Sequence, residues 1–192
     1  CEVHPYKRYK IIIVSDEMGL SIIMGNMFSG KTSELIRRLK RLKVIGKEVM
    51  IVNSAKDTRS PEEVLKTHDN VKFNCHKVYD LFDIIDTDEF ERADIIAIDE
   101  AQFFPRLKKF IEGCLYLEKS IIIAGLDGDC FQRKFGELID CIPLASDVTK
   151  LSALCMHCND GTPGPFTKRI VKDKTLELIG GSDMYEAVCH NH

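Results

Sequence analysis

Short apolar runs, separated by segments of mixed polarity, set the first expectation for this chain. Residues 20–24, 48–52, 95–98 and 120–125 are dominated by Ile, Val, Met, Leu and Ala and show no alternation with polar residues. Strands that are buried on both faces of a sheet have this pattern, because neither face meets water. We therefore expect an α/β fold with a parallel sheet that helices cover on both faces.

Two of the segments between these runs have apolar residues at helical spacing. Residues 33–42 repeat leucine and isoleucine at helical spacing directly after the first run, and Gly46 provides a stop. A second helix is expected after Pro105, because the apolar residues of 107–115 fall on one face.

Three other segments of the core carry weaker signals. Residues 53–70 are polar and contain Pro61, which predicts a loop. Residues 71–75 have the length and composition of a short strand, and residues 81–85 read as a helical piece.

The pattern changes near residue 150, where alternation replaces the solid apolar runs. Residues 166–171 and 175–179 predict two strands of a hairpin that turns at Asp173 and Lys174. We therefore expect a core domain at 18–151 and a C-terminal module at 152–192. About forty residues are too few for a convincing core of their own.

A glycine-rich segment lies between the first strand and the first helix. It matches G-x-x-x-x-G-K-[ST], the phosphate-binding loop. It consists of Gly25, Asn26, Met27, Phe28, Ser29, Gly30, Lys31 and Thr32. The glycines let successive backbone N–H groups curl around a polyphosphate. Lys31 can reach the β- and γ-phosphates, and the Thr32 hydroxyl can join the shell of a bound Mg²⁺. The segment therefore predicts binding of a nucleoside triphosphate.

Two acidic residues follow the strand expected at 95–98. Asp99 would hold Mg²⁺ directly or through water, and Glu100 would take a proton from water or from a substrate hydroxyl. An acidic pair at a strand end is by itself more often a solvated turn, and the phosphate loop about seventy residues earlier favours the catalytic interpretation. Arg59 could offer its planar donor fork to a phosphoryl group in transit, or be a solvated loop charge.

Cysteine and histidine gather in the C-terminal module as C-x₂-C, thirty residues and C-x₂-H. The candidate ligands are Cys155, Cys158, Cys189 and His192. Thiolates and imidazole suit tetrahedral Zn²⁺, and four protein ligands leave no open position, so the metal would be structural. His190 and His157 compete with His192 as the fourth ligand. The alternative is three reduced cysteines and an unrelated terminal histidine.

Composition limits the class of protein. The 192 residues suit one core domain with a small appendage, and a net charge of -3 with a pI near 6.1 leaves no electrostatic footprint of nucleic-acid binding. The longest apolar run near the N-terminus, residues 11–14, is too short to cross a membrane. We expect a cytoplasmic protein with no membrane partner. We expect residues 1–17 to be an extension that precedes an alternative start at Met18.

Taken in order, these motifs resemble those of the type II thymidine kinases, a family of cellular and poxviral enzymes, and the resemblance runs from about residue 19 to the C-terminus. The matching segments are 25–32, 56–59, 67–69, 99–104, 126–128, 131–136, 150–151, 155–158, 167–169 and 179–185. The core of the family is a P-loop NTPase fold similar to that of the RecA-type ATPases. The other functions considered are an ATPase acting on nucleic acid and an inactive zinc-binding module.

The resemblance implies transfer of the γ-phosphoryl group of ATP to the 5′-hydroxyl of thymidine or deoxyuridine. Glu100 would be the general base, Arg59 and Lys31 would stabilise the transferring group, and Asp99 would support Mg²⁺. The implied site for ATP and Mg²⁺ comprises residues 25–32 with Asp57, Thr58, Arg59, Asp99, Glu100, Ala101 and Gln102.

For the nucleoside, the resemblance implies a loop, or lasso, that grips the base through main-chain groups and is tethered by the zinc module. Phe131 would stack on the base, Met27 and Leu126 would line its pocket, and Tyr185 would anchor the nucleoside. The full implied set is Met27, Phe103, Leu126, Phe131, Thr167, Leu176, Glu177, Leu178, Ile179, Gly180 and Tyr185. Family members are commonly tetrameric and inhibited by thymidine triphosphate.

Three of the departures from the family pattern bear on Phe131 and on the metal ligands. Cys130 is an extra residue before Phe131, and a residue usual between Lys134 and Phe135 is missing, so the stacking position of Phe131 could shift. His192 stands where the family usually has a final cysteine.

Overall fold

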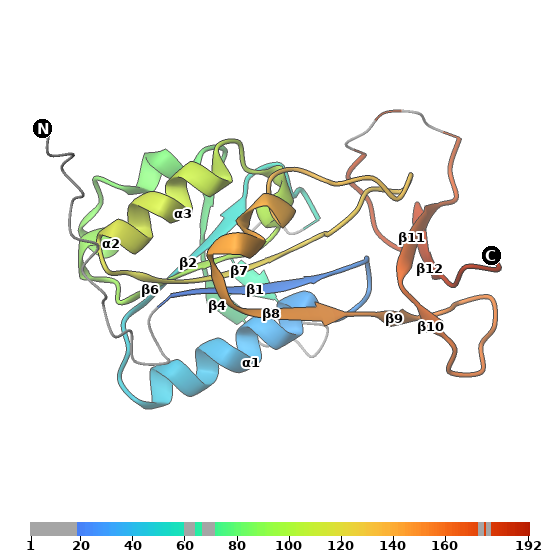
Figure 1. The fold of residues 1–192 in the computed structure, drawn as a ribbon, viewed down its shortest axis with the longest axis horizontal. Coiled ribbons are helices and arrows are strands. Elements are labelled where there is room, and N and C mark those ends of the chain that lie inside the picture. The colour runs from blue at the N-terminus through green and yellow to red at the C-terminus, as the bar shows by residue number, and fades with distance from the viewer. Residues whose placement is uncertain (1–18, 60–63, 67–71, 173–174, 176–177) are drawn as a thin grey trace, which may run out of the picture.

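A computed structural model of the chain describes residues 19–59, 64–66, 72–172, 175 and 178–192 (Figure 1). Six strands form one sheet, and every neighbouring pair in it is parallel. In spatial order they are β5 (His76–Val78), β2 (Val49–Ser54), β6 (Ile95–Ile98), β7 (Ser120–Gly125), β1 (Leu20–Gly25) and β8 (Ala145–Leu151). The predicted parallel sheet is confirmed, and β6 and β7 have the bounds expected from their apolar runs.

Helices cover both faces of this sheet (Figure 1). They are α1 (Lys31–Val44), α2 (Asp88–Arg92) and α3 (Leu107–Tyr116), with short 3-10 helices η1 (Leu81–Ile84), η2 (Ala101–Phe103) and η3 (Ile139–Leu144). Adjacent residues of β1 show why both faces must be covered. Ile22 belongs to the apolar cluster that contains Phe110 of α3, and Ile23 belongs to the cluster that contains Leu35 of α1. All four are at most 2% exposed, so β1 is buried on both sides.

The turn from β1 into α1 needs glycine at both ends of the phosphate loop. A Cβ on Gly25 would lie 2.2 Å from the backbone oxygen of Leu151, and Gly30 has a φ of 82°, in the left-handed region. Helix α1 then ends at Val44, ahead of Gly46. The predicted order of strand, loop and helix is confirmed.

Four short strands form two antiparallel ribbons in the C-terminal module (Figure 1). Strand β9 (Ala153–Leu154) pairs with β10 (Pro163–Gly164), and β11 (Phe166–Arg169) pairs with β12 (Tyr185–Val188). The predicted hairpin of 166–171 with 175–179 is therefore wrong. None of the described residues from 175 to 180 belongs to a strand, and the turn expected at 173–174 lies outside the described residues.

The segment expected to be a loop at 53–70 also contains a strand. Strand β3 (Val64–Lys66) pairs antiparallel with β4 (Lys72–Asn74), and the strand expected at 71–75 corresponds to β4. Within the described residues, no helix is both long and apolar enough to cross a membrane.

Candidate active site

The phosphate loop is held by hydrogen bonds to one of its own carbonyl groups. The Asn26 carbonyl accepts from the Lys31 ammonium at 2.7 Å and from the Ser29 hydroxyl at 2.8 Å. Burial lowers the pKa of Lys31, and the carboxylates of Glu100 and Asp99 oppose that shift. A partly buried ammonium next to carboxylates and a loop of N–H groups forms a site for a polyphosphate.

The acidic strand end lies next to this loop. Strands β1 and β6 are parallel and separated only by β7, so their carboxyl ends meet at one edge of the sheet. The Thr32 hydroxyl donates to the Asp99 carboxylate at 2.8 Å, and Asp99 is 3% exposed. Burial, and then the neighbouring Glu100, raise the pKa of Asp99 above its usual range. A hydroxyl and a carboxylate in contact are oxygen ligands of the kind that Mg²⁺ takes.

Glu100 is held between two donors. Its Oε1 accepts from the Arg59 guanidinium, and its Oε2 accepts from the Gln102 amide at 2.6 Å. Its backbone lies in the left-handed region, with a φ of 52°. Such strain in a residue other than glycine is common at functional sites.

Arg59 joins the candidate base to a second carboxylate. Its Nε donates to Asp57 Oδ1 at 2.7 Å. Burial disfavours the charge of Arg59, but Glu100 and Asp57 outweigh it and raise the pKa of the guanidinium. In turn, burial would raise the pKa of Asp57, and the hydrogen bond from Arg59 reverses the direction. Arg59 is therefore a permanent cation beside the phosphate loop, while its neighbour Thr58 is exposed.

Gln102 connects the acidic site to the segment expected to line the nucleoside pocket. Its Oε1 accepts from the backbone N–H of Leu126 at 2.9 Å, while its amide donates to Glu100. The side chain is 3% exposed, so both bonds are shielded from water. The neighbours in η2 are buried as well: Ala101 is fully buried, and Phe103 packs edge-on against Phe135 with ring centroids 5.5 Å apart.

Hydrogen bonds connect several of the residues expected to bind a nucleoside. The Met27 N–H donates to the Thr167 hydroxyl at 3.0 Å, and both side chains are buried. The Tyr185 hydroxyl donates to the Leu178 carbonyl at 2.7 Å. Ile179 and Gly180 are described, whereas Leu176 and Glu177 lie outside the described residues.

Phe131 is 52% exposed, and the Arg133 guanidinium lies 4.8 Å from the centre of its ring. The buried Asp129 shapes this turn, because its carboxylate accepts from the N–H groups of Phe131 and Arg133. The ring is therefore accessible for stacking. Its role stays a prediction.

Four metal-ligand side chains come together in the C-terminal module. The ligand atoms of Cys155, Cys158, Cys189 and His192 all lie within 4.8 Å of one another. The Cys158–Cys189 sulfur atoms are 3.8 Å apart, and His192 Nδ1 lies 3.3–3.7 Å from the three sulfurs. A tetrahedron with Zn–S bonds of about 2.3 Å has edges of about 3.8 Å, so this donor set fits Zn²⁺.

The two competing histidines have other neighbours. His157 Nε2 lies 2.8 Å from a Glu186 carboxylate oxygen, and the His190 ring packs against Phe166 with centroids 4.5 Å apart. The structure thus favours His192 among the three histidines that the sequence left open.

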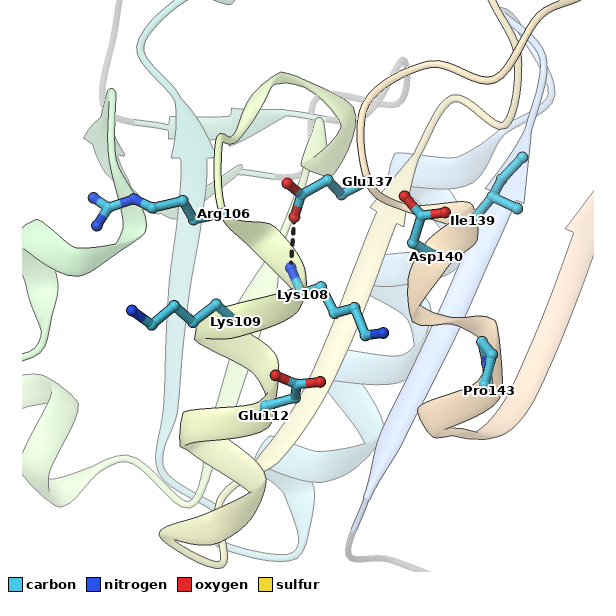
Figure 2. Close-up of a pocket in the computed structure, with 8 residues that line it drawn as sticks. All are labelled: Arg106, Lys108, Lys109, Glu112, Glu137, Ile139, Asp140 and Pro143. Atoms are coloured by element: carbon cyan, nitrogen blue, oxygen red, sulfur yellow. Dashed lines mark hydrogen bonds between the residues drawn. The ribbon is translucent and has the colours of Figure 1, made fainter.

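An open pocket lies apart from the predicted catalytic, nucleoside-binding and metal-ligating residues. Figure 2 shows it between α3 and the segment around η3, where Glu137 Oε2 accepts from the Lys108 N–H at 3.0 Å. Its lining consists of Arg106, Lys108, Lys109, Glu112, Glu137, Ile139, Asp140 and Pro143. Side chains of both charges line it, and none of the sequence-predicted site residues belongs to it.

Two polar side chains near the predicted site residues, Arg169 and Lys150, had no role assigned from the sequence. Arg169 donates to the Tyr185 hydroxyl at 3.0 Å and to the Thr175 carbonyl at 2.6 Å. Lys150 pairs with Asp127 at 2.9 Å, and that carboxylate also contributes to the electrostatics of Lys31. Both side chains lie within segments that resemble the family. That resemblance was the one feature of the sequence that could have indicated a role for them.

The parallel sheet, the phosphate loop and the acidic strand end define a P-loop nucleoside triphosphate-binding protein. A family model described as thymidine kinase matches residues 18–192. The chain belongs to the thymidine kinase family, which confirms the resemblance seen in its motifs.

Similar proteins come from plants, mammals and viruses. Thymidine kinase a of Arabidopsis thaliana is 43% identical over 177 residues, which cover 89% of this chain and 73% of that protein. The cytosolic thymidine kinase of Bos taurus is 40% identical, over 88% of this chain and 69% of its own length. The thymidine kinase of sheeppox virus is 41% identical, over 88% of this chain and 93% of its own length.

Proposed function

We propose that this chain transfers the γ-phosphoryl group of ATP to the 5′-hydroxyl of thymidine or deoxyuridine, as a thymidine kinase. The observation that carries the proposal is the meeting of the phosphate loop with the acidic strand end, through the 2.8 Å hydrogen bond from Thr32 to Asp99. Family membership supplies the substrate class, because the similar proteins are thymidine kinases.

The nucleotide would lie along the phosphate loop. The N–H groups of residues 25–32 would surround the phosphates, and Lys31 would neutralise their charge. Thr32 and Asp99 would hold Mg²⁺, which neutralises phosphate charge when it is bound. Phosphoryl transfer needs little covalent chemistry from the protein, so positioning and charge neutralisation carry most of the catalysis.

Glu100 and Arg59 would exchange partners during the reaction. In the structure the guanidinium occupies Oε1 of Glu100. When Arg59 turns its donor fork toward the transferring phosphoryl group, that oxygen becomes free to accept the proton of the 5′-hydroxyl. Gln102 keeps its bond to Oε2 and so keeps the carboxylate oriented.

The nucleoside would bind between the loop and the C-terminal module. Met27 and Leu126 would line the base pocket, Phe131 would stack on the base, and main-chain groups of residues 176–180 would pair with its edge. Tyr185 would anchor the nucleoside, and the bond from its hydroxyl to the Leu178 carbonyl supports a position for it beside this segment.

The Cys₃His cluster would bind a structural Zn²⁺. Its four ligands leave no open position for chemistry. Among the described residues of the module, the apolar cluster consists of Cys155, Val188 and Cys189, with Cys158 and Phe166 packed against it. So small a core leaves a need for the folding free energy that metal ligation supplies.

Three finer parts of the proposal rest on kinship alone. They are a homotetrameric assembly, inhibition by thymidine triphosphate and a cytoplasmic location. The bovine relative is named as cytosolic.

One assay tests the proposed function. Purified protein is incubated with ATP and Mg²⁺, with and without thymidine, and thymidine monophosphate and ADP are measured by chromatography. Equal amounts of both products, formed only when thymidine is present, are expected. ADP release without thymidine monophosphate, particularly if DNA stimulates it, would instead indicate an ATPase that acts on nucleic acid.

A further inference from the structure

The side chain of Asn26 bonds the phosphate loop to the C-terminal module. Its amide nitrogen donates to the Gly164 carbonyl at 2.8 Å and, at 3.4 Å, to the Phe166 carbonyl. Its amide oxygen accepts from the Ala153 N–H at 3.1 Å. Asn26 is 3% exposed, so water competes little for these bonds.

The same residue also organises the loop through its backbone. Its carbonyl accepts from Lys31 and Ser29, and the N–H of the next residue, Met27, donates to Thr167 of the module. Two consecutive residues of the loop therefore contact the module, while the carbonyl between them orients the lysine that faces the phosphates.

The partners of the amide are themselves closely constrained. Ala153 and Gly164 are opposite one another in the β9–β10 ribbon, so the Asn26 amide bridges the two strands. A Cβ on Gly164 would lie 2.8 Å from the backbone of Cys155, so the ribbon packs so closely there that only glycine fits. Cys155 belongs to the Cys₃His cluster. A continuous set of contacts thus runs from the metal cluster to the phosphate loop.

We propose that Asn26 is a positioning residue that holds the phosphate loop and the C-terminal module in register. The proposal rests on the proposed function, because register matters when one element binds the phosphoryl donor and the other binds the acceptor. A shift of about 1 Å between reacting groups is enough to lower a rate by as much as about 100-fold. The loop motif leaves the residue at this position free, so the motif itself does not require asparagine.

Hydrogen exchange of single amides tests the contact without reference to activity. In Asn26→Ala, the Ala153 N–H loses its acceptor and should exchange at least about tenfold faster. The Cys155 N–H, which donates to the Thr162 carbonyl at 2.8 Å, serves as the internal control and should stay protected. An Ala153 amide that stays as protected as in the wild type would overturn the proposal.

Kinetics test the positioning role. In Asn26→Ala, kcat/KM for thymidine should fall about 10-fold to 100-fold while the KM for ATP stays within about twofold, because the loop itself is intact. Ile111→Val, a buried change in α3, is the control for general destabilisation. It should leave kcat/KM for thymidine and the KM for ATP unchanged. If the constants for thymidine and for ATP change equally, Asn26 has only a structural role, which would contradict the proposal.

The near-isosteric variant Asn26→Asp adds a pH readout. Burial raises the pKa of a carboxyl group, and the protonated form can still donate to Gly164 and accept from Ala153. The thymidine KM of this variant, relative to wild type at the same pH, should be near one at about pH 6 and rise toward about pH 9. The Lys31 ammonium, which bonds the Asn26 carbonyl, opposes the effect of burial on this pKa. A ratio that stays near one from about pH 6 to about pH 9 would contradict the proposal. If the wild type forms no thymidine monophosphate, the proposed function fails, and the exchange pattern still decides whether Asn26 joins loop and module.

Discussion

Replacing Gln102 by leucine probes the connection between the candidate base and the nucleoside pocket. The substitution keeps the approximate volume of a side chain that is 3% exposed and removes its amide. Two groups then lose their bond to Gln102: Oε2 of Glu100, at 2.6 Å, and the Leu126 N–H, at 2.9 Å, while Oε1 of Glu100 keeps its bond from Arg59.

The expected loss follows from these two contacts. A hydrogen bond to a charged group contributes about 1.5–3 kcal/mol, and a buried N–H without an acceptor costs about 1–3 kcal/mol. Since the two are not strictly additive, we expect the free energy of unfolding to fall by about 2–5 kcal/mol. With a urea slope of about 2 kcal/mol per molar, the unfolding midpoint should fall by about 1–2.5 M. Because Gln102 would no longer orient the Glu100 carboxylate, kcat should also fall by about 10-fold to 100-fold.

Equilibrium unfolding in urea, followed by circular dichroism, measures the first effect, and a thymidine monophosphate assay measures the second. Gln132→Leu is the matched control, because Gln132 is exposed; its free energy of unfolding should change by no more than about 0.5 kcal/mol. If Gln102→Leu proves as stable and as active as that control, the contacts of Gln102 do not hold the site.

Three further predictions address other parts of the molecule. His192→Ala should reduce bound zinc from about one ion per chain, measured by mass spectrometry of the metal; an unchanged zinc content would remove His192 from the ligand set. Burial raises the pKa of the Cys114 and Cys141 thiols to about 12 in each case, so both should resist alkylation by iodoacetamide at about pH 8 until urea unfolds the chain, and rapid native labelling would contradict this. Arg38→Met should lower the free energy of unfolding by about 1–3 kcal/mol, because Arg38 is mostly buried and joins α1 to β8 through Asp147 and Thr149; a loss below about 0.3 kcal/mol in urea unfolding would show that these bonds contribute nothing net.

Much of the core was predictable because its signals are local. The solid apolar runs at 95–98 and 120–125 fixed β6 and β7, and the glycine spacing of 25–32 marked the turn from strand to helix. The meeting of Thr32 with Asp99 followed from sheet topology, since both are near the carboxyl ends of parallel strands.

The C-terminal module was less predictable because its partners are distant in sequence. Alternation in 166–171 and 175–179 suggested a hairpin, but β11 pairs with β12, whose residues precede the ligands Cys189 and His192. The metal cluster and tertiary contacts, rather than local turn propensity, favour that pairing. Likewise, the Asn26 amide bonds residues that lie 127–140 positions away, and no periodicity along the chain indicates such a contact.

Glu100→Gln tests the central claim most directly. The substitution preserves size and replaces the carboxylate, which can accept a proton and pairs with Arg59, by an amide, which cannot accept a proton. Because the phosphate loop is unchanged, the variant should still bind ADP in calorimetry. Its single-turnover rate of thymidine monophosphate formation should fall by about 10²–10⁴, the usual contribution of a general base. A variant that forms thymidine monophosphate at the wild-type rate would contradict the assignment of Glu100 and the mechanism built on it.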